Sequence, residues 1–250
     1  MSLGHLRSFL FTDPLIILLT IGFGSASFVA TLFDRSGRLP EKLARAWARA
    51  LLRVSGVEIH TEGFEKIDPR QKYVFVVNHR SYMDIPALLA SLPVEIRFYA
   101  KQGLFLIPFL GTHLKRAGHL PVVRGDARAS VKSMTLGARL IQERHVSMLL
   151  FPEGGRSRGP MREFKEGAAY IAIKAGIPVV PLGIAGTRDV LPMGSSHVRG
   201  GTVTLRMGEP ILTAGMKLHD RGQLTALLER QVAELAGEPA PHPAEAPRPV

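Results

Sequence analysis

The longest apolar stretch of the chain lies close to its start. Residues 14–33 contain no charged side chain over 20 positions. As a helix this stretch would be about 30 Å long, which matches the hydrocarbon core of a bilayer. Gly22 and Gly24 lie near its middle and could bend it. The pattern predicts a membrane anchor over residues 1–35, formed as a single span or as a helical hairpin in one leaflet. A cleaved signal peptide is a third interpretation.

A basic amphipathic stretch follows the apolar one. Leu43, Trp47 and Leu51 recur at the spacing of one helix face, and six arginine or lysine residues lie between positions 35 and 53. This pattern predicts a helix over residues 36–55 that lies on an anionic membrane surface, although an ordinary surface helix of the domain has the same pattern. The excess of basic residues also predicts that this side of the anchor is cytoplasmic.

From about residue 56 onward, short apolar runs alternate with helical patterns. The run 73–77 is continuously apolar and rich in β-branched residues, which is typical of a strand buried on both faces. The alternation predicts an α/β domain over residues 56–236, with a mostly parallel sheet flanked by helices. Residues 237–250, rich in Pro and Ala, are predicted to be a disordered tail. The expected strands are 73–77, 96–100, 147–151, 179–184 and 203–207, and the expected helices are 85–92, 127–144, 166–175 and 224–235.

The amino-acid composition excludes some kinds of site and indicates the charge of the partners. The chain has 250 residues and no Cys, which excludes a disulfide framework, a thiolate metal site and a Cys nucleophile. The formal net charge is +11, which indicates an anionic partner such as a membrane face, an acidic substrate or an acidic carrier protein. Basic and aromatic residues do not interleave as in a recognisable nucleic-acid module, so we expect no nucleic acid among the partners. A mean hydropathy of +0.11 favours the membrane.

The first polar stretch with candidate chemistry follows the expected strand 73–77 and reads Asn-His-Arg-Ser-Tyr-Met-Asp over residues 78–84. His79 would lie in the turn after the strand and Asp84 at the start of the next helix. The carboxylate could then accept a hydrogen bond from one imidazole nitrogen and leave the other as a general base. A five-residue His-to-Asp spacing is common by chance, and a capping Asp beside an exposed loop His fits it equally well.

The second polar stretch follows the expected strand 147–151 and reads Phe-Pro-Glu-Gly-Gly-Arg-Ser-Arg. Gly154 and Gly155 let the backbone turn sharply and approach a ligand. Arg156 and Arg158 offer guanidinium donors that suit a phosphate. Glu153 could position an arginine or the backbone of the loop. The alternative is a polar loop with two solvated arginines.

Two apolar stretches accompany these polar ones. Residues 101–111 could line an acyl channel or touch lipid, and an ordinary core or membrane-facing helix explains them equally well. Residues 177–184 form an expected strand whose two prolines indicate a pocket wall or a sheet edge.

Taken in order, the four stretches resemble the 1-acylglycerol-3-phosphate acyltransferases of the glycerolipid acyltransferase superfamily. The motif NHxSxxD of that family is complete over residues 78–84, and residues 151–157 are similar to its FPEGTRS segment. Lys101 begins a segment similar to K-x-x-L-F-x-x-P-x-x-G, which leads to Arg124. The order and spacing of the four stretches match over roughly residues 70–190.

Two departures from the family pattern lie in the stretches that the resemblance links to the acceptor. Gly155 stands where the family usually has Thr, and Val123 precedes Arg124 where the family often has Asp. The choice of acceptor is therefore the open part of the prediction.

The resemblance implies an O-acyltransferase. His79, oriented by Asp84, would deprotonate an acceptor hydroxyl, which attacks the thioester of acyl-CoA or acyl carrier protein without an acyl-enzyme. The implied acceptor is 1-acylglycerol 3-phosphate, which gives phosphatidic acid in phospholipid biosynthesis; glycerol 3-phosphate, another lysophospholipid or a lyso-aminolipid are the alternatives. The residues implied for the acceptor phosphate are Arg156, Glu153, Gly154, Arg124 and Lys165, with Asn78, Ser81, Gly155, Ser157 and Lys101 in support.

The resemblance implies no metal and no organic cofactor, and it implies no particular oligomeric state. The expected partners are the lipid bilayer, the lysophospholipid acceptor and the thioester donor. The expected location is the inner cell membrane, with the catalytic domain on the cytoplasmic side. A basic, non-catalytic membrane-binding protein is a remote alternative.

Overall fold

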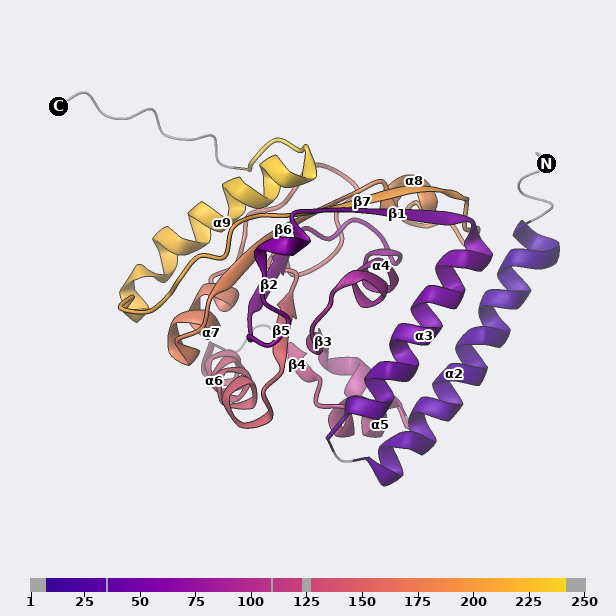
Figure 1. Ribbon diagram of the computed structural model, residues 1–250, viewed down its shortest axis with the longest axis horizontal. Helices are drawn as coiled ribbons and strands as arrows, with labels where there is room; N and C mark the ends of the chain where they lie inside the picture. The colour runs from indigo at the N-terminus through magenta and orange to yellow at the C-terminus, as the bar shows by residue number, and fades with distance from the viewer. Residues whose placement is uncertain (1–7, 35, 109, 123–126, 242–250) are drawn as a thin grey trace.

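The computed structural model describes residues 8–34, 36–108, 110–122 and 127–241. Its centre is a seven-stranded sheet with the strand order β1-β7-β6-β2-β5-β3-β4 (Figure 1). Every neighbouring pair of strands is parallel except β6 and β7. The predicted fold class, a mostly parallel sheet with flanking helices, is therefore confirmed. The strands are β1 (Val57–Glu62), β2 (Val74–Val77), β3 (Ile96–Lys101), β4 (Leu120–Val122), β5 (Ser147–Leu150), β6 (Val179–Ala185) and β7 (Gly201–Met207).

Helices cover both faces of the sheet, because successive side chains of a buried strand point to opposite faces. Phe75 and Val77 of β2 pack with α3 and α4, whereas Val74 and Val76 pack with α6, α7 and α9. Burying each such side chain contributes about 1.5–3 kcal/mol. The helices of the domain are α3 (Arg38–Ser55), α4 (Asp84–Ser91), α5 (Leu110–Arg116), α6 (Ala127–Arg144), α7 (Gly167–Ala175), α8 (Thr187–Val190) and α9 (Arg221–Ala236).

Two strands were not predicted from the sequence, and both lie at the edges of the sheet. β1 pairs only with β7, and most of its side chains are exposed, so it lacks the apolar run of a buried strand. β4 has three residues and pairs with the end of β3. Such short or polar edge strands carry little hydrophobic signal, because each buries few side chains, such as Val57 of β1 and Leu120 of β4, in addition to its backbone pairing.

The proline-rich strand β6 is not a sheet edge, which corrects one interpretation of residues 177–184. It lies between β7 and β2. The Pro181 carbonyl accepts a hydrogen bond from the Gly208 N–H at 2.9 Å, just beyond the end of β7. Pro181 is tolerated in a central strand because its missing N–H falls where the β7 ladder has ended.

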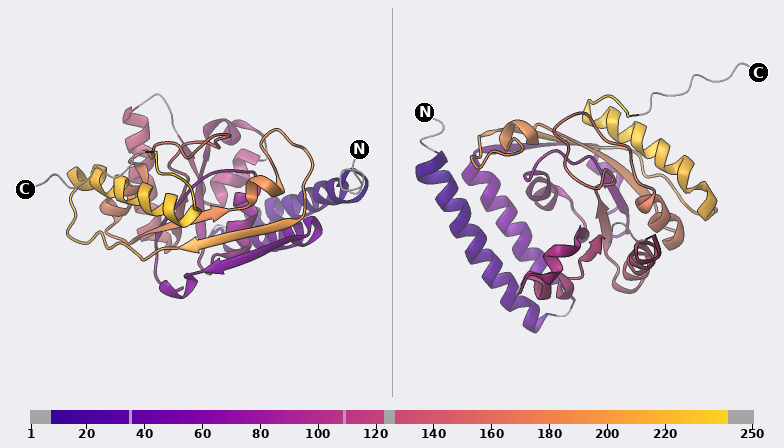
Figure 2. Two further views of the ribbon diagram at one scale, coloured as in Figure 1. Left: turned by 90° about the horizontal axis from the view of Figure 1, so that it is seen from above. Right: turned by 180° about the vertical axis from the view of Figure 1, so that it is seen from behind.

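The apolar N-terminal stretch forms one uninterrupted helix, α2 (Asp13–Phe33), preceded by the π-helical turn η1 (Ser8–Thr12). The chain passes Gly22 and Gly24 without a break, so the described part of the stretch contains no hairpin of its own. Instead α2 runs antiparallel to α3 along one end of the molecule (Figures 1 and 2), and the Trp47 indole N–H donates to the Thr20 hydroxyl at 3.1 Å.

The outer surface of α2 is apolar and exposed. Leu18 and Ile21 are 65% and 61% exposed. The helical segment Ser8–Phe33 is long and apolar enough to cross a membrane. Helix α3 exposes the basic side chains of Lys42, Arg49 and Arg53 and buries its other face against the domain. The N-terminal helix pair therefore combines an apolar and a basic surface, as membrane-associated helices do.

The predicted disordered tail, residues 237–250, is ordered where it begins. The Glu238 N–H bonds to the Ala233 carbonyl at 2.9 Å, the Glu238 side chain pairs with Arg80, and Ala240 packs against the core beside α7 and α9. The composition of the tail carried no signal for these contacts, because Glu238 and Ala240 meet residues that are distant in the sequence. Residues 242–250 lie outside the described part of the chain.

Candidate active site

The two polar stretches meet at the carboxyl edge of the sheet. β2 and β5 are parallel neighbours, so residues 78–84 and 151–158, which follow them, emerge side by side. The His79 ring stacks on the Phe151 ring with centroids 3.8 Å apart and planes 16° apart. This edge is where open α/β sheets place their ligands.

His79 and Asp84 form a buried hydrogen-bonded pair. The distance from His79 Nδ1 to Asp84 Oδ2 is 2.7 Å. The same carboxylate oxygen accepts the backbone N–H groups of Arg80 at 2.7 Å and Ser81 at 2.9 Å. Because this oxygen acts as an acceptor, His79 Nδ1 carries the proton and Nε2 keeps its lone pair. No described residue hydrogen-bonds to Nε2.

The local backbone holds this pair in place. Asp84 is the first residue of α4, and Pro86 in the first turn suits a helix start. The Asn78 side chain donates to the Ile184 carbonyl at 2.9 Å and accepts the Ile184 N–H at 2.8 Å, which ties the end of β2 to β6. The Ser81 hydroxyl donates to the Leu191 carbonyl at 2.8 Å. Asn78 and Ser81 thus fix the turn that carries His79.

Glu153 lies beneath the glycine-arginine loop and joins it to the turn with His79. Its Oε1 accepts the His79 N–H at 2.7 Å, and its Oε2 accepts the Arg162 N–H at 2.9 Å. The Arg80 guanidinium lies 3.4 Å from Oε2. Burial raises the pKa of the Glu153 carboxyl, and these contacts oppose that shift. Glu153 thereby connects residues 151–158 to residues 78–84 through hydrogen bonds.

Arg156 faces Tyr82 of the neighbouring stretch. Its guanidinium carbon lies 3.8 Å from the centroid of the Tyr82 ring, a cation–π contact. Its Nε is buried and has no hydrogen-bond partner in the described part of the chain. Burial lowers the pKa of Arg156, while Tyr82 and Asp84 act in the opposite direction. The guanidinium therefore lies in the field of Asp84 with donors left over for a ligand.

The loop glycines differ in what they require. Gly154 has φ +74°, and a Cβ there would lie 3.0 Å from Lys165 Nζ. The exposed Lys165 is held by its own N–H, which bonds to the Pro152 carbonyl at 3.0 Å. A Cβ at Gly155 would have no neighbour within 4 Å. The site thus has room for a Thr side chain at position 155.

The remaining predicted residues are placed as follows. Ser157 closes the loop, because its hydroxyl donates to the Pro160 carbonyl at 3.0 Å and its N–H lies 3.4 Å from the His79 carbonyl. Lys101 ends β3 at the same edge of the sheet and is exposed. Arg124 lies outside the described residues. The described site residues therefore converge at one edge of the sheet, with the carboxylates buried beneath the cations.

The apolar stretch 101–111 forms the 3₁₀ turn η3 (Gln102–Leu106) and the start of α5. Phe105 is buried, but Leu106 is 80% exposed and Ile107 is 47% exposed. An ordinary core helix is excluded for this stretch, and contact with lipid is the interpretation that its exposure favours.

Three side chains of this site were not predicted. Tyr82 occupies a variable position of the motif, Arg80 another, and Phe151 ends the second apolar run. Their side-chain directions depend on how two separate loops meet, and the spacing of the motif carries no signal for that.

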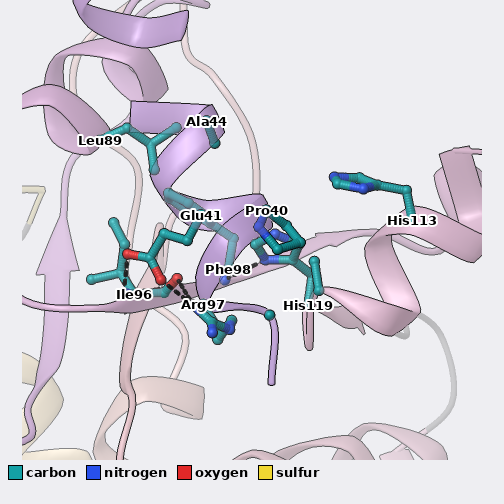
Figure 3. A pocket seen from close by; sticks show the side chains of 11 residues that line it. Pro40, Glu41, Ala44, Leu89, Ile96, Arg97, Phe98, His113 and His119 are labelled. Carbon is teal, nitrogen blue, oxygen red and sulfur yellow. Dashed lines mark hydrogen bonds and ion pairs between the residues drawn. The ribbon is translucent and has the colours of Figure 1, made fainter. Parts of the chain in front are cut away.

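A second group of buried polar residues lines a small pocket between α3, β3 and α5 (Figure 3). His119 Nδ1 accepts the Phe98 N–H at 3.1 Å. Burial, with the charge of Arg97 and the neighbouring His113, lowers the pKa of His119 to about 3. Arg97 is 1% exposed and is ion-paired with Glu41. None of the lining residues belongs to the two polar stretches. Across the described residues, no three His, Asp or Glu side chains form a metal-binding group.

A model of the acyltransferase family matches residues 58–185, which include both polar stretches. Several relatives are 1-acyl-sn-glycerol-3-phosphate acyltransferases. A chloroplastic protein of that name from Brassica napus is 34% identical over 78% of this chain, but the match covers 57% of that relative. For a similar chloroplastic protein of Arabidopsis thaliana the covered share is 54%. The chain thus spans little more than half the length of these relatives.

Two other proteins match almost end to end. A lyso-ornithine lipid O-acyltransferase of Pseudomonas aeruginosa is 30% identical, over 96% of this chain and 97% of that protein. The crystal structure of the 1-acyl-sn-glycerophosphate acyltransferase PlsC of Thermotoga maritima is similar with a TM-score of 0.72. It is 25% identical, and the match covers 92% of this chain and 96% of that one.

Proposed function

This chain belongs to the acyltransferase family, and on that basis we propose that it transfers an acyl group from acyl-CoA or acyl carrier protein to the free hydroxyl of 1-acylglycerol 3-phosphate, which yields phosphatidic acid. The observation that carries the proposal is the juxtaposition of His79 and Arg156. Among the described residues, none hydrogen-bonds to Nε2 of His79, and the buried Nε of Arg156 has no hydrogen-bond partner.

His79 is the general base. Its Nε2 takes the proton of the acceptor hydroxyl as the hydroxyl oxygen attacks the thioester carbonyl carbon. The carbon–sulfur bond then breaks, and the leaving thiolate takes the proton back from the imidazolium. Asp84 keeps Nδ1 protonated and stabilises the positive ring that forms between the two steps. No acyl-enzyme is needed, so the lack of Cys is no obstacle.

Arg156 binds the acceptor phosphate. A guanidinium with free donors suits a phosphate oxygen pair, and the nearby Lys165 ammonium adds a second positive charge. The ring of Tyr82 holds the guanidinium in place before the ligand arrives, which reduces the entropy lost on binding. Arg124 and Lys101 are further ligands in this proposal, and Gly154 and Gly155 let the loop close around the phosphate.

The enzyme works at a membrane surface, with the bilayer, the lysophospholipid and the thioester carrier as its partners. The exposed apolar face of α2 and the basic face of α3 support this location. In the proposal the membrane is the inner cell membrane and the domain lies on its cytoplasmic side. The reaction requires no metal or organic cofactor.

A second acceptor class is supported by a separate observation. The relative that this chain matches almost end to end acylates a lyso-ornithine lipid according to its name. A lyso-ornithine lipid has no phosphate group, so Arg156 would have no phosphate to bind in this acceptor. The Gly155 position, which offers no hydroxyl to the acceptor, is compatible with either acceptor.

An acceptor panel separates the two classes. Purified protein in phospholipid vesicles is assayed with acyl-CoA or acylated carrier protein as the donor. The acceptor is 1-acylglycerol 3-phosphate, glycerol 3-phosphate or lyso-ornithine lipid. We expect the phosphate acceptor to be preferred, and Arg156→Ala to raise the KM for it without a matching effect on the ornithine lipid. A clear preference for lyso-ornithine lipid would replace the phosphate assignment while leaving the chemistry in place.

The general-base assignment has its own test. His79→Ala should lower kcat about 10³-fold while the protein remains folded and bound to vesicles. His60→Ala is the matched control, since His60 lies exposed on β1, away from the site. Full activity of His79→Ala would exclude His79 as the base.

A further inference from the structure

Helix α9 ends in a turn that sends the chain back toward the sheet. Gly237 has φ +68°, which glycine adopts readily, and its N–H bonds to the Glu234 carbonyl at 3.0 Å. The next N–H, that of Glu238, bonds to the Ala233 carbonyl at 2.9 Å. These two bonds fix the backbone of Glu238 relative to α9, which itself packs on β6 and α7.

The Glu238 carboxylate accepts hydrogen bonds from the Arg80 guanidinium with both of its oxygens. Arg80 Nε donates to Oε1 at 2.6 Å, and Arg80 Nη2 donates to Oε2. The Arg80 side chain is 3% exposed and that of Glu238 is 23% exposed. A two-point contact of this kind fixes the orientation of the guanidinium as well as its position.

Arg80 connects this carboxylate to both members of the proposed catalytic pair. Its backbone N–H donates to Asp84 Oδ2, the same oxygen that accepts His79 Nδ1. Its remaining Nη1 lies 3.4 Å from Glu153, which accepts the His79 N–H with its other oxygen. Glu238 is thus one residue removed from the hydrogen bonds that orient His79.

Without Glu238, the buried guanidinium would keep only its longer contact to Glu153. A buried charge that loses its partner is strongly destabilised, so Arg80 would move toward Glu153 or toward water. Either movement pulls on the backbone N–H that Asp84 accepts. A displacement of the catalytic base by a fraction of an ångström is enough to slow proton transfer.

We propose that Glu238 is a positioning residue for acyl transfer, which acts through Arg80 on the turn that carries His79 and Asp84. The proposal rests on the proposed role of His79 as the general base. It gives the first residues after α9 a task in the active site, although Glu238 is 159 positions away from His79 along the chain.

The test compares Glu238→Gln with Glu234→Gln, a matched change at an exposed position on the last turn of α9. We expect Glu238→Gln to lower kcat about 10-fold with little change in the KM for the acceptor, because the loop with Arg156 is untouched. Glu234→Gln should leave both quantities unchanged.

A double-variant cycle asks whether Glu238 works through Arg80. If it does, adding Glu238→Gln to Arg80→Met lowers kcat no further than Arg80→Met alone. Should Arg80→Met fail to fold, hydrogen exchange decides instead: the peptide covering residues 78–84 should exchange faster in Glu238→Gln than in the wild type or in Glu234→Gln.

Glu238→Gln with the kcat and the exchange of the wild type would overturn the proposal, whatever its melting temperature. A lower melting temperature alone, with kcat and the exchange of residues 78–84 unchanged, would mean a purely structural ion pair and would overturn it as well. Failure of the proposed function is recognised separately, because the wild type would then transfer no acyl group, or His79→Ala would remain active.

Discussion

His79 and His119 are both partly enclosed and each lies near an arginine, but they differ in the hydrogen-bond partner of Nδ1. At the carboxyl edge of the sheet, His79 Nδ1 faces the Asp84 carboxylate at 2.7 Å. In the pocket of Figure 3, His119 Nδ1 faces the Phe98 N–H at 3.1 Å. The first nitrogen must be a donor and the second an acceptor, so the two rings hold opposite tautomers. Only His79 has a lone pair on Nε2 and a carboxylate to stabilise its protonated form.

The two arginines differ in a parallel way. Arg97 in the pocket is ion-paired with Glu41 and donates to the Ile96 carbonyl at 3.0 Å. Arg156 at the site rests on the Tyr82 ring and donates no hydrogen bond to a described residue. The comparison teaches that burial beside an arginine does not by itself make a histidine functional. The hydrogen-bond partner of Nδ1 and the donors left unused by the arginine separate the two groups.

The largest effect is expected from a change of Asp84, the carboxylate that distinguishes His79 from His119. Asp84→Asn places a neutral amide where the carboxylate accepts three hydrogen bonds, so the Nδ1 proton is no longer enforced. We expect kcat to fall by roughly 10² to 10⁴-fold, because the ring adopts the wrong tautomer and its protonated form loses its counter-charge. Steady-state kinetics with one acyl donor measures this. An Asp84→Asn protein within twofold of wild-type kcat would show that Asp84 does not orient His79.

Substitutions around the buried Arg97 should change the stability of the protein and not its activity. Glu41→Gln removes the buried counter-charge of Arg97 and leaves only the partly exposed Glu95, which should lower the free energy of unfolding by about 3 kcal/mol. Glu95→Gln is the matched control, since Glu95 contacts the same arginine at 3.7 Å but its side chain is 40% exposed; its effect should stay below about 1 kcal/mol. Urea unfolding reports both. Equal losses for the two variants would contradict the difference in burial.

His119 predicts a pH dependence of stability whose sign follows from its lowered pKa. The folded protein holds His119 with a pKa of about 3, whereas the unfolded chain has the ordinary value near 6.5. The unfolded state therefore binds more protons between these values, and stability falls as pH falls through this window. Between pH 7 and pH 4.5 this lowers the free energy of unfolding by about 2.5 kcal/mol. His119→Asn, which keeps an acceptor for the Phe98 N–H, should remove this part of the acid destabilisation.

Unfolding at pH 7 and at pH 4.5 checks the His119 prediction, with the exposed His60→Asn as the control. An acid dependence of His119→Asn equal to that of the wild type would assign the loss to other groups.

The smallest expected effect concerns the support of Arg156. Tyr82→Leu removes the aromatic face under the guanidinium, whereas Tyr82→Phe keeps it. A cation–π contact at a partly exposed site is worth about 1 kcal/mol, so Tyr82→Leu should raise the KM for the phosphate acceptor about fivefold with kcat nearly unchanged. Tyr82→Phe should restore the wild-type KM. If Phe were no better than Leu, the Tyr82 hydroxyl rather than its ring would be the functional part.

The sequence could predict those parts of the fold and the site that depend on neighbouring residues. The continuous apolar run at 73–77 indicated a buried strand because each of its side chains meets a hydrophobic layer. The motif at 78–84 indicated a strand-to-helix turn, since Asp84 and Pro86 suit a helix start. β1 and β4 escaped prediction because an edge strand is recruited by its neighbour and not by its own hydrophobic pattern.

By itself, the sequence determined the alternation of strands and helices, the apolar N-terminal helix and the two polar stretches, because each depends on periodicity and local conformational preference. The tertiary structure alone decided that the His79 turn lies beside the loop with Arg156, that Tyr82 lies under the Arg156 guanidinium, and that Glu238 returns to Arg80. Those outcomes depend on strand order and on loops that meet from distant parts of the chain, and hydrogen-bond partners chosen across such distances leave no trace in local spacing.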